Sequence, residues 1–172
     1  MQFPCLADSL KALWEYFVDS LDLKTRCAIM RSQRMPKKSS VQKKLTRHEQ
    51  RDLDIEIGFL EGVVKRDAQY VEALQILGDD YTRRGRYRDG LSVDERLAQI
   101  RPEDSLVLYN LACSYSLTDQ VGEALLALER ALSLGYRDFK WLAEDPDLRN
   151  VRRHPLFQKI RAKLRTLQIK VR

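Results

Sequence analysis

A chain of 172 residues, 44% apolar and 33% charged, has the composition of one ordinary globular domain or of a short repeat array with tails. No apolar run approaches the roughly 18 residues that a membrane-spanning helix needs, so we expect no membrane span. The three cysteines form no CxxC pair, which favours reduced thiols and a cytoplasmic location.

The net charge of +6 is unevenly distributed along the chain. Residues 1–50 hold ten Lys and Arg against five Asp and Glu, residues 51–104 hold nine against thirteen, and residues 105–172 hold twelve against seven. Basic ends bind acidic partners such as nucleic acid in some proteins and are simply solvated in many others. Charge alone therefore makes nucleic-acid binding an alternative function and not the leading one.

Residues 1–23 predict an amphipathic N-terminal helix, because large apolar side chains recur at helical spacing with acidic side chains between them. The apolar members are Leu6, Leu10, Leu13, Trp14, Phe17, Val18 and Leu21. We expect this helix to pack on the body of the protein. The alternatives are a homodimer contact through residues 6–22, a docking helix, or a segment that occupies the protein's own groove. The segment lacks a basic start followed by an unbroken apolar region, which argues against a signal peptide, and its acidic residues argue against a transit peptide.

Residues 24–49 predict a flexible basic linker, because they are rich in Lys, Arg, Ser and Gln and poor in large apolar side chains. No aromatic residues are interleaved to stack on bases, so a connector is favoured over a nucleic-acid site. Met35, followed by Pro and two Lys, is an alternative start of the native product.

Residues 50–70 predict a single helix whose apolar side chains lie on one face. Leu53, Ile57, Leu60 and Val64 form this face. The helix has no apolar partner helix in the residues before it, so we expect it to shield the N-terminal end of the structure that follows.

Residues 71–136 contain one pattern twice, with a period of 34 residues. Leu74, Leu77, Gly78 and Tyr81 return as Leu108, Leu111, Ala112 and Tyr115, and Gly90, Leu91, Leu97 and Ala98 return as Ala124, Leu125, Ala131 and Leu132. The spacing within each half is that of one helix face, and the small residue at 78 lets a neighbouring helix approach closely. Each unit therefore predicts two antiparallel helices that must stack on neighbours to bury their apolar faces.

This period and pattern resemble the tetratricopeptide repeat. The resemblance implies an all-α array of antiparallel helix pairs, with a half repeat at 50–70, two full repeats at 71–136 and a C-terminal capping segment at 137–172. Asp94 and Leu128 depart from the family pattern, which often has an aromatic residue there.

The resemblance also implies a binding groove, because the first helices of successive repeats line a concave surface that takes peptides or helices. By position in the unit, the residues that point into it are Glu72, Gln75, Ile76, Asp79 and Arg83 in the first full repeat and Leu106, Tyr109, Asn110, Cys113 and Ser116 in the second. Of these, the predicted binding residues are Gln75, Asp79, Arg83, Tyr109, Asn110, Cys113 and Ser116. Glu72 and Asp79 would repel the terminal carboxylate that chaperone-binding members of the family hold. The partner is therefore expected to be another protein that presents a peptide or a helix in some other way.

The sequence offers little for catalysis. It has two histidines, no HExxH or GxSxG motif and no Gly-rich phosphate loop, so we expect no enzyme, no cofactor and no metal. Asp145 and Asp147, on either side of Pro146, fit a turn and a helix start better than a cation site, because two carboxylates alone make a poor ligand set.

The C-terminal segment 137–172 crowds aromatic residues, prolines and arginines together, which suggests either a basic binding site or a stopper on the helical array. Its pattern resembles the segment that closes groups of these repeats in many bacterial proteins. The matching residues are Leu134 to Tyr136, Asp145 to Leu148, Arg152, Pro155 and Phe157. A cap with inward aromatic side chains is therefore favoured, because an end repeat needs its outer face covered.

The predicted function is a non-catalytic scaffold or adaptor that binds another protein in a short groove. A nucleic-acid-associated protein that uses its basic ends is the alternative.

Overall fold

The computed structural model describes residues 45–170, and the side chains as far as Thr166. In this part of the chain every regular element is a helix, and no strand is present, which confirms the all-α class for these residues. The elements are α3 (Arg47–Arg66), α4 (Val71–Arg84), α5 (Tyr87–Ile100), α6 (Ser105–Leu117), α7 (Val121–Ser133), α8 (Phe139–Glu144), the 3-10 helix η1 (Pro146–Leu148), α9 (Arg149–Arg153) and α10 (Phe157–Lys170). The predicted helix 1–23 and most of the predicted linker 24–49 lie outside the described residues.

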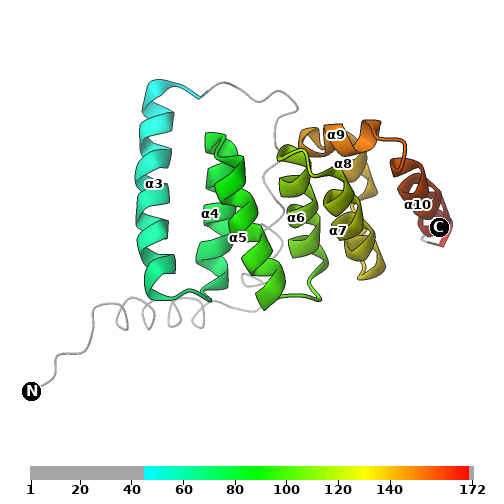
Figure 1. Ribbon diagram of the computed structural model, residues 1–172, viewed down its shortest axis with the longest axis horizontal. Coiled ribbons are helices and arrows are strands. Elements are labelled where there is room, and N and C mark those ends of the chain that lie inside the picture. The colour runs from blue at the N-terminus through cyan, green and yellow to red at the C-terminus, as the bar shows by residue number, and fades with distance from the viewer. Residues whose placement is uncertain (1–44, 171–172) are drawn as a thin grey trace, which may run out of the picture. The chain divides into compact units, whose positions relative to one another are not determined.

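Helices α3 to α7 lie side by side, and each packs against the next one along the chain (Figure 1). The short elements α8, η1 and α9 follow α7 and return to α6 and α7, and α10 lies at the end opposite α3. The order of the helices in space thus follows their order in the sequence as far as α7, after which the chain turns back onto α6 and α7.

Helix α3 begins at Arg47, three residues earlier than the sequence pattern predicts. The reason is a capping box: the Glu49 amide donates to Thr46 Oγ1 at 3.3 Å, and the Thr46 amide donates to Glu49 Oε2 at 2.7 Å. These bonds satisfy two amide groups that would otherwise lack partners at the helix start. The last residues of the predicted linker are therefore helical.

The buried face of α3 is the predicted one. Leu53, Ile57 and Leu60 are buried and pack with Ala73, Leu77 and Tyr81 of α4, while Val64 is partly buried beside them. Each buried Leu or Ile side chain contributes about 1.5–3 kcal/mol of transfer free energy. This packing covers one side of α4.

The turns between paired helices repeat with the sequence. Gly85 follows α4 with a φ of 81°, and Asp119, 34 positions later, follows α6 with a φ of 61°. The amide of Arg86 donates to Tyr81 O at 2.8 Å, and the amide of Gln120 donates to Tyr115 O at 2.9 Å. Glycine adopts this left-handed conformation without strain, and aspartate is among the residues that tolerate it best, so both turns end a helix in the same way.

Gly78 has the role that its place in the pattern predicts. A Cβ atom at this position would lie 3.0 Å from Asp94 Oδ1 of α5, which is too close for an ordinary contact. The buried Asp94 carboxylate in turn accepts a hydrogen bond from the hydroxyl of Ser114 on α6. Asp94 therefore forms a polar link between α5 and α6.

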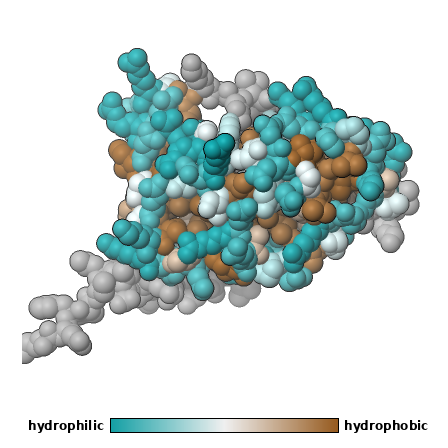
Figure 2. Space-filling model, in the orientation of Figure 1, coloured by the Kyte–Doolittle hydropathy of each residue, from teal (hydrophilic) through white to brown (hydrophobic). Residues whose placement is uncertain are grey.

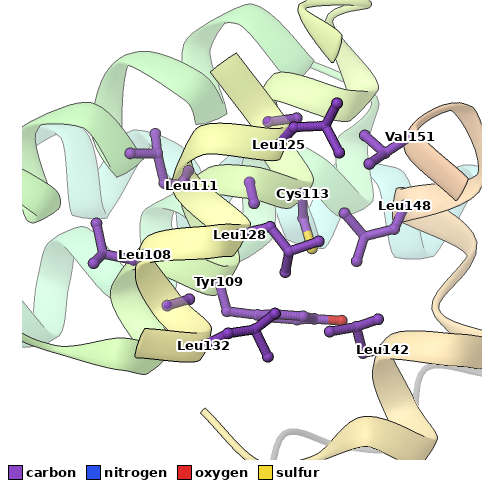
Figure 3. Packing of buried hydrophobic residues seen from close by; sticks show 14 of the residues in the cluster. Leu108, Tyr109, Leu111, Cys113, Leu125, Leu128, Leu132, Leu142, Leu148 and Val151 are labelled. Carbon is purple, nitrogen blue, oxygen red and sulfur yellow. The ribbon is translucent and has the colours of Figure 1, made fainter. Parts of the chain in front are cut away.

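The largest cluster of buried side chains joins α6 and α7 to the C-terminal elements (Figure 3). Its fully buried members include Leu128 and Leu132 of α7, Leu142 of α8, Leu148 of η1 and Val151 of α9. Tyr136 and Phe157 are also buried, and Phe139 and Trp141 are partly buried against the cluster. Residues 136–160 therefore pack as part of the helical body, with their aromatic side chains directed inward.

No helix within residues 45–170 is both long enough and apolar enough to cross a membrane.

Candidate binding surface

The first helix of each pair supplies the predicted binding residues, and the structure places them in two different environments. On α4, Gln75 and Arg83 are exposed and Asp79 is half-buried. They recur at intervals of four residues and therefore lie along one side of the helix. Ile76, an apolar neighbour, is 48% exposed. This side of α4 is an accessible surface with mixed chemistry.

On α6, three of the four predicted residues are covered by the chain itself. Tyr109, Cys113 and Ser116 are buried, and only Asn110 is half-buried. The expectation that these three side chains line an open groove is wrong, because the segment from Tyr136 to Leu148 lies against them.

Tyr109 is held at both its ring and its hydroxyl group. Its ring stacks on Tyr136 with 4.1 Å between centroids and an interplanar angle of 5°, and its hydroxyl donates to Asp145 Oδ2 at 2.7 Å. Figure 3 shows the ring reaching from α6 toward Leu142. Burial raises the pKa of Tyr109, so its hydroxyl remains a protonated donor at physiological pH. The side chain is an internal link and not a free anchor for a ligand.

The carboxylate of Asp145, at the junction of α8 and η1, accepts hydrogen bonds from several donors. Besides Tyr109, its Oδ2 lies 3.6 Å from Cys113 Sγ, and its Oδ1 accepts from the Asp147 amide at 2.9 Å. The last bond starts η1, so this residue makes a turn and a helix start, as its sequence context predicts. No group of three or more potential ligands that would hold a metal occurs among the described side chains.

Three further hydrogen bonds hold the same segment in place. The Ser116 hydroxyl donates to the carbonyl of Asp147 at 2.6 Å. The guanidinium of Arg152 donates to the carbonyl of Leu142 at 3.2 Å and to that of Asp145. Arg152, one of the residues that match the capping segment, is thus bonded to carbonyl groups within the C-terminal segment.

Arg83, one of the predicted surface residues, also contacts a buried acid. Its Nη1 donates to Asp80 Oδ1 at 2.8 Å, while Asp80 Oδ2 is buried and has no hydrogen-bond partner in the described structure. Desolvation, helped by the charge of Glu56 and opposed by Arg83, raises the pKa of Asp80 to about 6. A carboxylate with one unsatisfied buried oxygen destabilises the folded state whenever it is ionised.

Asp80→Asn is therefore expected to raise the free energy of unfolding at pH 7.5 by an amount on the order of 1 kcal/mol. Because the folded-state pKa lies above the unfolded value of 3.8, the native protein holds this proton more tightly. The contribution of protonated Asp80 to the free energy of unfolding is therefore fully present below the unfolded pKa and is lost as the pH rises through about 6. Urea denaturation of both proteins at several pH values should show the gain above that pH and its disappearance toward pH 4. An equal gain at every pH would contradict the assignment.

The sequence did contain a signal for the covered face of α6. Its residues "SLVLYNLACSYSL" are apolar or small on every side of the helix, which is typical of a helix buried all round. The four predicted residues of this helix cannot all be exposed under such a pattern.

Comparison with known proteins gives a partial match. No family model matches the chain. A stretch of 79 residues is 40% identical to a chloroplastic protein of Arabidopsis thaliana, and the match covers 44% of this chain and 24% of that protein. The chain thus spans about a quarter of the length of the curated relative that it matches.

Proposed function

We propose that the chain is a non-catalytic scaffold, built from tetratricopeptide-like helix pairs, that holds a peptide or helix of another protein against the free sides of α4 and α6. One observation supports this site above others. Ile76 on α4 and Leu106 on α6 are 48% and 40% exposed, although both helices contribute to the same buried cluster through Leu74 and Val107.

Polar groups stand near these two apolar side chains in the sequence of each helix. Gln75 and Asp79 neighbour Ile76 on α4, and the half-buried Asn110 lies one turn beyond Leu106 on α6. An amide side chain can donate and accept at once, which suits the backbone of an extended peptide. Apolar anchors with an amide beside them are the chemistry of a protein-binding surface. We place this activity in a reducing compartment such as the cytoplasm, because the sequence has three cysteines and no CxxC pair.

The double substitution of Ile76→Asp with Leu106→Asp is expected to reduce partner capture in affinity purification from native cells by about tenfold or more, because it puts charge on both apolar anchors. Leu126→Asp on α7, at a similarly exposed apolar position, is the matched control and should capture as the unchanged protein does. Circular dichroism and thermal melting establish that each variant is folded. Full capture by the folded double variant would refute this surface.

The alternative is binding to nucleic acid through the basic C-terminal end. Residues 148–172 contain no Asp or Glu, and Arg149, Arg153, Lys159 and Arg165 are exposed. Binding through phosphate contacts must weaken steeply with salt, with a slope set by the number of phosphates contacted. Absence of binding to duplex or single-stranded nucleic acid near physiological salt would remove this alternative.

A further inference from the structure

The side of α3 that faces away from α4 carries an apolar stripe open to solvent. Ile55 is 66% exposed and Phe59, one turn later, is 69% exposed. Gly58 lies three residues after Ile55, and Gly62 lies three residues after Phe59. All four residues therefore share this side of the helix. Figure 2 shows apolar surface at the edge of the molecule where α3 lies. Two large apolar side chains on one helix face are a recognisable docking feature.

The two glycines of this stripe have no role in the described fold. A Cβ atom at Gly58 or Gly62 would meet nothing within 4 Å, whereas one at Gly78 would lie only 3.0 Å from Asp94 Oδ1. Glycine inside a helix is less stable than alanine, because it loses more backbone freedom on folding. A helix surface without Cβ atoms does, however, let a second backbone approach closely. The pair therefore leaves room for a second helix to pack directly on this part of α3.

The charges at the two ends of the stripe indicate the chemistry of that partner. Arg51 and Arg66 are exposed on the same side, about 22 Å apart along the helix at 1.5 Å per residue. Neither forms an ion pair with any residue of the described chain. Four acids lie between them in sequence. Asp52 is paired with His48 Nδ1 at 2.6 Å, Asp54 with Arg84 Nε at 2.6 Å and Glu61 with Arg86 Nη1 at 3.3 Å, while Glu56 is exposed. Both ends of the apolar stripe thus present positive charge.

We propose that the stripe Ile55, Gly58, Phe59 and Gly62, flanked by Arg51 and Arg66, binds an amphipathic helix of a partner protein. That helix carries large apolar side chains along one face, which fill the space over the glycines, and carboxylates near both ends, which face the two arginines. The site is separate from the α4 and α6 surface and does not depend on it. A scaffold with both surfaces holds two proteins together.

The test uses the full chain and a synthetic helical peptide of 18 residues, with Leu and Trp on one face and Glu near both ends. A peptide with the same apolar face and Arg near both ends is its control. By fluorescence anisotropy, the glutamate peptide should bind one site at least about tenfold more tightly than the arginine peptide. Equal affinity for the two peptides, or no binding of either, would overturn the proposal.

Two variants separate docking from a purely structural role. The double substitution of Gly58→Ala with Gly62→Ala should raise the melting temperature by about 5 °C and at the same time weaken peptide binding by about tenfold. Phe59→Ser should remove measurable binding, while Leu126→Ser on α7 should leave it unchanged. Alanines at positions 58 and 62 that leave the affinity unaltered would refute close helix packing.

A further variant tests the chain's own N-terminal segment as the occupant. A peptide that binds only after Trp14→Ser would assign this face to that segment and would overturn the proposal of an external partner.

Discussion

Leu148→Ala is expected to lower the free energy of unfolding by about 2–5 kcal/mol. The side chain is fully buried in η1 and belongs to the cluster that joins α6 and α7 to the C-terminal elements. Removing it leaves a cavity among well-packed neighbours, so the loss combines the transfer free energy with the cost of unfilled space. Urea denaturation followed by helical circular dichroism measures the change.

Leu156→Ala is the matched control for this prediction. Leu156 lies eight positions later in the same C-terminal region but is 50% exposed, so its removal should cost less than about 1 kcal/mol. If the C-terminal cap is integral to the body, Leu148→Ala should lower the stability of α3 to α7 as well. If Leu148→Ala melted only the C-terminal elements and left the other helices at full stability, the segment would be an appendage and not a cap.

The helices and turns of residues 71–136 could be predicted because a period of 34 residues carries several independent constraints at once. Leu74 and Leu108 specify one face, Gly78 specifies a close approach, and Gly85 with Asp119 marks the turns. Each of these signals is local and refers to the same helix pair. The start of α3 was also encoded locally, in the Thr46 and Glu49 capping box, but the polar composition of the preceding residues obscured it.

The candidate surface could be predicted only in part, because its fate depends on contacts between distant residues. Tyr109 meets Asp145 across 36 positions, and Ser116 meets Asp147 across 31. The position of a residue within a repeat predicts which side of its helix the residue occupies. Tyr109 lies on the side of α6 that contacts Tyr136 and Asp145. The position within a repeat does not tell whether solvent or the chain's own C-terminal segment covers that side. The predicted binding residues are therefore accessible on α4 and mostly covered on α6.

The covering of α6 makes its polar links energetically important, as Tyr109→Phe should show. This substitution removes a single oxygen and is expected to lower the free energy of unfolding by about 1.5–3 kcal/mol, the range for a hydrogen bond to a charged group. Without the hydroxyl, Asp145 Oδ2 keeps only the weak donor Cys113 Sγ at 3.6 Å, while the carboxylate remains buried. The ring and its stacking on Tyr136 remain in place. Urea denaturation at pH 7 measures the loss.

Tyr115→Phe removes the same atom from the next tyrosine of α6 and is the control. Its hydroxyl donates to Glu95 Oε1 at 3.0 Å at an exposed site, where water can replace the lost partner, so the cost should stay below about 1 kcal/mol. A double substitution of Tyr109→Phe with Asp145→Asn then measures the coupling. If the buried link is real, Tyr109→Phe should cost less once the carboxylate is neutral, because no buried charge is left without its donor. Additive losses would show that the Tyr109 hydroxyl does not stabilise the fold through the Asp145 carboxylate.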